Sequence, residues 1–389
     1  MNNIIKTIAL EEDLAPKQVK ATVDLLDDGN TIPFIARYRK ENTGGLDEEQ
    51  LRAINERIEY LRNLEDRKQE VIRLIDKQDK LTEELEEKIK SSSILQEVED
   101  LYRPYKQKKK TRASKAKDKG LEPLAQTMWD QKLQKGDLKE IGQPFLNPEA
   151  KLESIEDVYQ GAHDIIAEWI SDTAEIRKKI RKITFDKGQI KSTCKDKVLD
   201  EKNNFEIYYD YQESIKDIPP HRVLALNRGE EEEILQIKVE VSQKKIFSLI
   251  REEVLKGDSI FKSKIIEAIE DSYKRLIAPS IAREVRNKLT DQAEEHAIDV
   301  FGRNLRSLLL QSPLKGNIVM GIDPGFRTGS KVCIVGERGN LLETNTIYPH
   351  APQNKTKQAQ NIVKNLIQKY NVESIAIGNG TASRETELF

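Results

Sequence analysis

Cysteine, histidine and aromatic residues are scarce in this 389-residue sequence, and each scarcity argues against a class of protein. The two cysteines, Cys194 and Cys333, lie far apart, which argues against a disulfide-stapled secreted domain. The four histidines are equally scattered, and neither residue type shows the spacing of a zinc site. We therefore expect neither a bound metal nor another cofactor.

Long apolar runs are also missing. No run approaches the roughly 20 residues that a membrane-spanning helix needs. The first residues, MNNIIKTIALEEDLAPKQ, turn acidic before an apolar segment of signal-peptide length develops. We expect a soluble, cytoplasmic protein with no membrane partner.

Charge of either sign is abundant, but its excess is small. Charged residues make up 34% of the sequence and hydrophobic residues 37%, while the net charge is only −2. This balance favours slender, charge-coated helices over one large sheet core, and the length favours two to four domains. Any site for a polyanion must come from a local cluster of basic residues.

The hydrophobic periodicity predicts a multidomain, mainly α protein. Residues 1–72 indicate a helical domain with a helix, a Gly-containing turn and a second helix, as in helix-turn-helix modules. A long helix follows from Asp47, its predicted N-cap, to about Gln78, and Thr82 is expected to cap the next. Residues 73–312 read as further amphipathic helices, with a weak alternation at Phe185–Cys194 that predicts a small hairpin.

The pattern changes within residues 313–389. IVMGID, KVCIVG, LLETNTIYP and SIAIGN predict four strands, with a helix from about Pro352 to Tyr370 before the last. This order indicates a separate α/β domain. The sequence stops at IAIGNGTASRETELF, where a strand passes into the next helix, so we expect this domain to be truncated.

The most basic segment is residues 103–119, RPYKQKKKTRASKAKDK, with nine Lys or Arg against one acid. We expect an exposed loop, which is either a solvated loop balanced by nearby acids or a site that binds phosphates in a salt-sensitive way. Tyr102 and Tyr105 at its start offer base stacking or simple packing. The candidate nucleic-acid-binding residues of this segment are Lys106, Lys108, Lys109, Lys110, Arg112, Lys115 and Lys117.

A second basic cluster lies in PFIARYRKENTGG. Arg37, Arg39 and Lys40 are set among apolar residues, so they project from a packed element, as in helix-turn-helix proteins that bind DNA. Structural ion pairs with helical glutamates are the alternative for these three cations.

Asp323 is the one candidate for catalysis at the end of a strand. In GIDPGFRTGSKVCIV, Pro324 and Gly325 fit the middle positions of a type II turn, and α/β domains place sites at such strand ends. Two-metal cleavage needs several converging carboxylates. The fourth strand, expected beside the first, offers only the amide of Asn379, so the pattern predicts at most a vestigial site.

Several long motifs together resemble the Tex family of bacterial transcription accessory proteins. They include GNTIPFIARYRKENTGGLDEEQLR, VEDLYRPYKQKKKTRASKAKDKGLEPLA, NFEIYYDYQESIKDIPPHRVLALNRGE and GNIVMGIDPGFRTGSKVCIV. The resemblance implies a helical N-terminal region with helix-turn-helix character, followed by a YqgF-like domain of the RNase H-like fold. In that family helix-hairpin-helix motifs and an S1 RNA-binding domain follow, and neither lies within these 389 residues. Asp323 would match the first acid of the resolvases of that fold, with Asn379 near the second.

Three functions remain open on the sequence alone. The first is a non-catalytic scaffold for transcription that binds RNA or DNA. The second is a metal-dependent nuclease or resolvase, and the third is a docking scaffold for RNA polymerase or ribosomal proteins.

Overall fold

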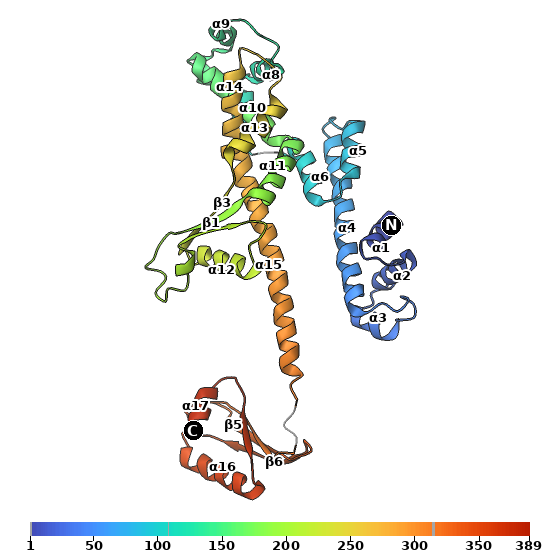
Figure 1. Cartoon of the computed structure of the whole chain (residues 1–389), viewed down its shortest axis with the longest axis vertical. Helices are drawn as coiled ribbons and strands as arrows, with labels where there is room; N and C mark the ends of the chain where they lie inside the picture. Colours follow the sequence, from blue (N-terminus) through green and yellow to red (C-terminus); the bar gives the residue numbers. More distant parts are fainter. Residues whose placement is uncertain (1, 108, 313–315) are drawn as a thin grey trace. The chain divides into compact units, whose positions relative to one another are not determined.

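The computed structural model describes residues 2–107, 109–312 and 316–389, and the chain divides into two compact units, residues 1–297 and 298–389. The first unit is mainly helical, and the second contains a mixed sheet (Figure 1). A multidomain, mainly α chain that ends in an α/β domain is what the periodicity predicted. Within the described residues, no helix combines the length and the apolar character needed to cross a membrane.

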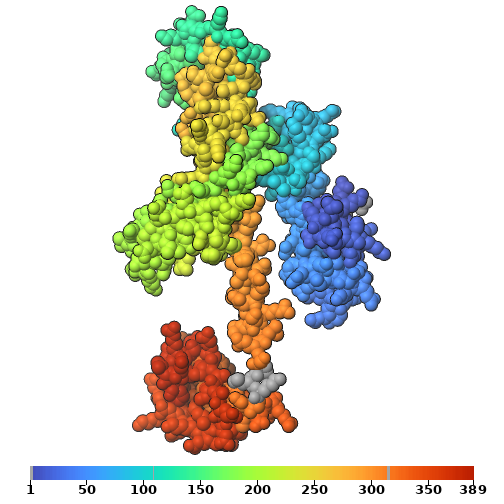
Figure 2. All heavy atoms as spheres, in the orientation of Figure 1, coloured from blue at the N-terminus to red at the C-terminus, as the bar shows by residue number. Residues whose placement is uncertain are grey.

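Four helices build the N-terminal domain, which Figure 2 shows in blue as one body of packed side chains. Its apolar core is formed by residues such as Ile8, Val23, Ile35 and Ile54, all fully or almost fully buried. A turn with Gly29 at φ 83° joins the second and third helices, as the helix-turn-helix pattern predicted. The helices are α1 (Asn2–Glu11), α2 (Pro16–Asp27), α3 (Ile32–Tyr38) and α4 (Glu48–Asp76).

The long helix α4 begins where the sequence predicted. The Asp47 carboxylate accepts a hydrogen bond from the Gln50 backbone N–H (2.9 Å), and the Asp47 N–H donates to the Gln50 side chain (3.1 Å). This capping box satisfies two backbone donors at the helix start. Thr82 likewise caps α5 (Glu83–Ser91), which packs with α6 (Leu95–Tyr102) on the second half of α4.

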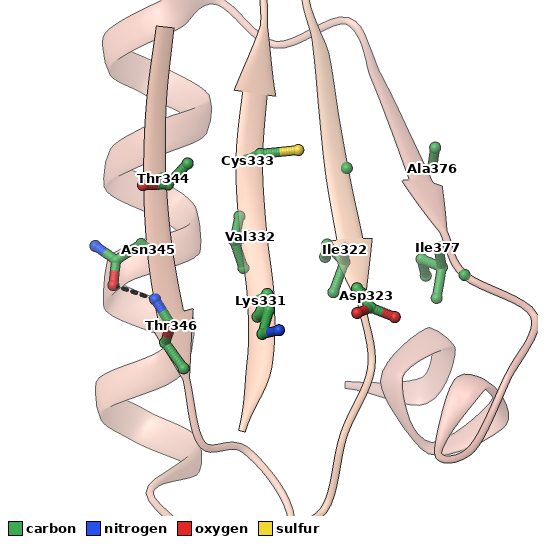
Figure 3. Close-up of a pocket in the computed structure, with 12 residues that line it drawn as sticks. Ile322, Asp323, Lys331, Val332, Cys333, Thr344, Asn345, Thr346, Ala376 and Ile377 are labelled. Carbon is green, nitrogen blue, oxygen red and sulfur yellow. Dashed lines mark hydrogen bonds between the residues drawn. The ribbon is translucent and has the colours of Figure 1, made fainter. Parts of the chain in front are cut away.

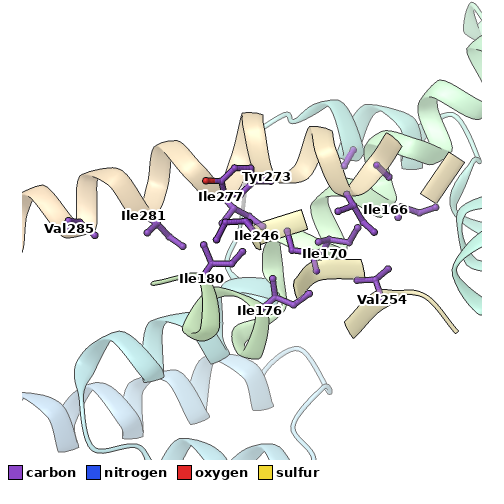
Figure 4. Packing of buried hydrophobic residues seen from close by; sticks show 14 of the residues in the cluster. Ile166, Ile170, Ile176, Ile180, Ile246, Val254, Tyr273, Ile277, Ile281 and Val285 are labelled. Atoms are coloured by element: carbon purple, nitrogen blue, oxygen red, sulfur yellow. The ribbon is translucent and has the colours of Figure 1, made fainter. Parts of the chain in front are cut away.

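The central region has one continuous apolar core around α10. Figure 4 shows Ile166 and Ile170 of α10 beside Ile176 of α11 and Ile277 of the π-helix η5, side chains at helical spacing that meet in the interior. The helices here are α7 (Arg112–Asp118), α8 (Glu122–Asp130), α9 (Leu138–Gly142), α10 (Ile155–Asp172), α11 (Ala174–Lys187), α12 (Pro220–Glu231), α13 (Gln243–Val254), α14 (Lys262–Asp271), η5 (Ser272–Ile277) and α15 (Ala278–Leu309).

The predicted hairpin at Phe185–Cys194 is wrong. Residues up to Lys187 finish α11, and only β1 (Gln189–Cys194) is a strand. It pairs antiparallel with β2 (Asp210–Ser214) and with β3 (Leu235–Glu240), in the order β2-β1-β3. The alternation was a real strand signal, but its partners lie far along the chain, where local periodicity carries no information about them.

The second unit contains the four predicted strands and the predicted helix. The sheet order is β6-β5-β4-β7, with β4 and β7 parallel and the other pairs antiparallel. Buried Met320, Ile322 and Val332 pack against Ala359 and Leu366 of the helix. The elements are β4 (Val319–Asp323), β5 (Ser330–Val335), β6 (Leu341–Ile347), α16 (Thr356–Tyr370), β7 (Ser374–Ile377) and α17 (Ser383–Leu388).

The connection after Asp323 differs from the predicted type II turn. Gly325 does not have a positive φ; Gly329 does, at 78°. Six residues separate β4 from β5, so the left-handed residue is needed at the end of a wider loop. A Cβ on Gly329 would lie 2.6 Å from the Tyr348 ring, which also requires glycine there.

Candidate nucleic-acid interface

The last residues of α3 and the two that follow, which we call the α3 turn (residues 37–40), project from a packed helix. Ile35 is fully buried in the N-terminal core, so the next residues are held at the surface. The Arg39 guanidinium lies 5.3 Å from the centroid of the Phe34 ring, and its Nη1 donates to the Tyr38 carbonyl oxygen (3.2 Å). Tyr38 is 60% exposed, so the turn presents an aromatic face beside three cations.

The cations of the α3 turn do not form the structural ion pairs that the sequence left open. Arg37, Arg39 and Lys40 are all exposed, and none forms an ion pair with an acid of the described residues. Arg57 and Arg62 of α4, by contrast, hold Glu11 and Asp27 at 2.6 and 2.7 Å. The turn therefore keeps its positive charge available to an external anion.

The basic segment, residues 103–119, is not wholly a loop as predicted. Its second half forms α7, capped by reciprocal hydrogen bonds between Thr111 and Ser114. Ala113 and Ala116 are buried against α10. Gly161 of α10 makes room for Leu121, which follows α7, because a Cβ there would lie 2.2 Å from Leu121 Cδ1. Alanines three residues apart are a weak apolar signal, which explains why the helix was missed.

Packing of α7 leaves most cations of the basic segment outside. Those that are exposed and without an ion pair to a described acid are Lys106, Lys109, Lys110, Arg112 and Lys115. Lys117 is half-buried and pairs with Glu122 at 2.9 Å, and Lys108 lies outside the described residues. At the start of the segment, burial lowers the pKa of the Arg103 guanidinium, which lies 3.4 Å from Asp172. Arg103 is thus part of the packing.

Asp323 lines a pocket of about 710 Å³ in the second unit (Figure 3). The pocket lies on the sheet and extends across four strands, from Thr344 of β6 to Ala376 of β7. Gly378 lines it too, and its N–H donates to the Ile322 carbonyl oxygen (2.8 Å). The parallel pairing therefore brings the ends of β4 and β7 together, as predicted, and exposed Asn379 follows directly.

Lys331 is the cationic neighbour of Asp323 in the sheet. It is the residue directly opposite Asp323 in the β4–β5 register, and both side chains line the pocket (Figure 3). Among the described residues, no set of three metal-ligating side chains includes Asp323. A lysine directly opposite in the register adds positive charge near the single carboxylate, which disfavours the divalent cations that two-metal cleavage requires in pairs. The sequence did not predict this role of Lys331, because only the strand register places it opposite Asp323.

One other group of potential metal ligands lies in the helical unit, where α10 meets α14. His163, Asp164 and Asp271 bring ligand atoms within 4.8 Å of one another. Arg275 forms ion pairs with both acids. Burial raises the pKa of Asp164; burial also acts on Asp271, but the Arg275 hydrogen bond holds the pKa of that carboxyl below its usual value. Asp164 and Asp271 therefore act as ion-pair partners of Arg275.

These features define a multidomain, mainly helical protein with a YqgF-like α/β domain and exposed cations on its helical part. Three family models match the chain: the Tex-like protein N-terminal domain over residues 2–76, the Tex central region-like model over residues 134–301, and the Tex protein YqgF-like domain over residues 317–389. The chain belongs to the Tex family.

The similarity to known proteins extends over nearly the whole chain. It is 52% identical to the uncharacterized protein YdcI of Bacillus subtilis (strain 168), 36% to the transcriptional accessory protein Tex of Neisseria gonorrhoeae and 32% to S1 RNA-binding domain-containing protein 1 of Homo sapiens. These matches cover 98%, 99% and 100% of this chain, and 53%, 51% and 40% of the three relatives. The chain spans about half the length of the bacterial relatives and less of the human one.

Proposed function

We propose that this chain is a non-catalytic scaffold of a transcription accessory protein and contacts RNA or DNA phosphates through the α3 turn and the basic segment. The observation that carries the proposal is the set of eight exposed cations that form no ion pair with a described acid: Arg37, Arg39, Lys40, Lys106, Lys109, Lys110, Arg112 and Lys115. The name of the Neisseria gonorrhoeae relative supports the transcription accessory role.

Pairing matters because binding to a polyanion is driven largely by release of its counterions. A cation already held by a carboxylate must give up that partner, whereas an unpaired cation exchanges only water and salt. The α7 packing adds pre-organisation, since Arg112 and Lys115 are carried by a helix that is fixed to α10. Eight such cations suit sequence-independent contact with the backbone.

The non-catalytic part of the proposal depends on Asp323. A lone carboxylate with Lys331 opposite it lacks the charge to hold two divalent cations. Asn379 would add an amide oxygen but neither charge nor a general base. The YqgF-like domain would then serve as a structural module.

Fluorescence anisotropy of the 389-residue chain with single-stranded RNA and with duplex DNA, over a salt series, tests binding. We expect log Kd to rise linearly with log salt. Changing Lys106, Lys109 and Lys110 to Ala should lower the magnitude of the slope by about 2 for single strands, at roughly 0.7 per lost contact. If the wild type binds and the variant shows the same slope, the basic segment does not contact the nucleic acid.

A matched control has the same charge change at paired lysines. Lys88, Lys90 and Lys262 are exposed, but each already forms an ion pair with an acid four residues earlier. Their replacement by Ala should leave the salt slope close to that of the wild type. An equal loss in both variants would mean that net charge alone governs binding, and no binding by wild type at low salt would overturn the proposal.

Cleavage assays test the absence of catalysis. Incubation of branched and linear DNA and of RNA with Mg²⁺ or Mn²⁺ should give no cleavage above a buffer control. Cleavage that is lost in Asp323→Asn would overturn this part of the proposal and favour the nuclease function. It would leave the phosphate contacts of the helical unit to be judged by anisotropy.

A protein-docking scaffold is a second candidate, and the C-terminal part of α15 favours it. Ile298, Phe301 and Leu308 are 71%, 67% and 60% exposed and lie on one helix face at spacings of three and seven residues. RNA polymerase or ribosomal proteins would be the partners. Binding of purified RNA polymerase or ribosomes that survives high salt and is lost in Phe301→Asp would support docking; its absence would reject it.

A further inference from the structure

A pocket of about 570 Å³ opens beside the basic segment, between helices of the first unit. Both of the chain's tryptophans, Trp129 of α8 and Trp169 of α10, line it. Pro104 and Tyr105 of η1 (Arg103–Tyr105), and Lys117 of α7, line it as well. Three of these five residues thus belong to the proposed phosphate-binding segment.

The walls of this tryptophan pocket are aromatic and fixed. The Trp129 and Trp169 rings meet edge to face, with centroids 5.9 Å apart and an interplanar angle of 76°. Both are half-buried, so part of each ring remains accessible. The structure also separates the two tyrosines that the sequence left equivalent. Tyr102 is only 8% exposed and belongs to the α4–α6 core, whereas Tyr105 is half-buried, packs against the edge of that core and also lines the pocket.

The lining of the pocket also carries charged and amide side chains. The Lys117 ammonium lies 5.8 Å from the Trp169 ring centroid, and Lys80 lines the pocket from the segment after α4. Gln126 adds an amide group, and Asp100, Glu168 and Asp172 add carboxylates, of which Asp172 forms an ion pair with Arg103. The Gln126 amide suits the polar edge of a base, whereas the carboxylates leave the phosphates of the strand to the cations of the basic segment.

We propose that the tryptophan pocket takes one unpaired base of a single-stranded nucleic acid while the adjoining phosphates lie on Lys106, Lys109 and Lys110. This inference rests on the proposed function and names its substrate class. A base inside a duplex is stacked on both faces and cannot enter, so the pocket selects single strands, loops or ends. A base stacks between or against the Trp and Tyr105 faces without sequence preference, because every base has a π-face.

Intrinsic fluorescence reports on this pocket directly, since no other tryptophan exists in the chain. The 389-residue chain would be titrated with an oligouridine, with an abasic strand of the same length and charge, and with a duplex of the same strand length. We expect saturable quenching by the oligouridine only. The abasic strand should bind at least about fivefold more weakly in anisotropy, the lower end of one base stack.

Variants sharpen the test. Tyr105→Ala should weaken oligouridine binding by about fivefold or more, whereas Tyr105→Phe, which keeps the ring, should bind like the wild type. A thermal melt of each variant checks that it is folded. The salt slope should stay unchanged in Tyr105→Ala, because no phosphate contact is removed.

The outcomes separate this inference from the proposed function. Equal binding of abasic and normal strands, or equal quenching by the duplex, would overturn the base pocket and leave the phosphate contacts standing. Salt-dependent binding in anisotropy without any quenching would likewise overturn the base pocket alone. No binding of any strand in anisotropy would overturn both proposals.

Discussion

Two arginine-rich regions of the helical unit show opposite uses of one residue type. Arg177 of α11 is fully buried, and it donates to Asp100 of α6 at 3.0 Å and to Glu284 of α15 at 2.6 Å. Arg181 contacts the same two acids, both at 2.8 Å. In the α3 turn, Arg37 and Arg39 are exposed and have no such partner among the described residues. Arg177 and Arg181 together close a network across three helices.

The difference teaches that an arginine count says little about binding. A guanidinium enclosed by carboxylates contributes nothing to the external field, because its charge is neutralised where it lies. An exposed guanidinium without a partner keeps both its charge and its five donors for a phosphate. Burial or pairing therefore excludes a cation from a nucleic-acid interface, and among the exposed, unpaired cations we expect those clustered in one segment to bind.

The largest expected effect comes from opening the buried network. Arg177→Ala would leave the carboxylates of Asp100 and Glu284 partly buried beside a cavity, with Arg181 as their remaining ion-pair partner among the described residues. We expect a loss of about 3–5 kcal/mol in the free energy of unfolding, measured by urea denaturation. Arg52→Ala, which removes an exposed pair with Glu48 at 3.2 Å, should cost roughly 0.5 kcal/mol or less. Equal losses of unfolding free energy in the two variants would contradict the expected difference between the buried and the exposed ion pair.

The second prediction concerns cations whose loss should weaken binding and leave stability unchanged. Changing Arg37, Arg39 and Lys40 to Ala should leave the free energy of unfolding within about 0.5 kcal/mol of the wild type. The salt slope of single-strand binding should fall by about 2, at roughly 0.7 per lost contact.

Lys6, Lys17 and Lys20 provide the control for this variant. They are exposed on the same small domain, and their replacement by Ala makes the same charge change. Their loss should alter the slope little. A stability loss of several kcal/mol in the α3-turn variant would show that its arginines act in packing instead, and the comparison with Arg177 would fail.

The sequence predicted elements whose signals are local. The Asp47 cap and the apolar period of α4 fixed that helix almost to its ends, and the continuous apolar runs predicted β4 to β7. The register that sets Lys331 opposite Asp323 was not predictable from periodicity, because strand alternation gives a face and not a neighbour.

The interface was only half predictable for a similar reason. Exposed cations such as Arg39 and Lys110 are visible in the sequence as clusters. Their lack of acidic partners within the described residues depends on which helices lie nearby, which only tertiary packing decides. The tryptophan pocket joins Tyr105 to Trp169, 64 residues further along the chain, through the packing of α7 and α8 on α10. No local pattern carries that contact.

The smallest expected effect concerns an arginine that is paired but not buried. Arg62 holds the Asp27 carboxylate with two hydrogen bonds, at 2.8 and 2.7 Å. The side-chain hydrogen bond from Arg62 lowers the pKa of Asp27 below its ordinary value, although partial burial opposes the shift. The unfolded chain therefore binds this proton more tightly than the folded one. The pair stabilises the fold above the unfolded pKa of about 3.9, and this contribution disappears as the pH falls through the lower, folded value.

Urea denaturation of wild type and Asp27→Asn at pH 7 and at about pH 2 measures this contribution. We expect a difference below about 1 kcal/mol at pH 7 that shrinks towards the lower pH, as the carboxyl of the folded chain takes up its proton. Asp24→Asn, on the same helix, exposed and without an ion pair to a described acid or base, serves as the control. If the cost of Asp27→Asn persists at low pH, Asp27 stabilises the fold through packing and not through its charge. The surface pair would then not be an electrostatic case between the buried Arg177 and the unpaired Arg39.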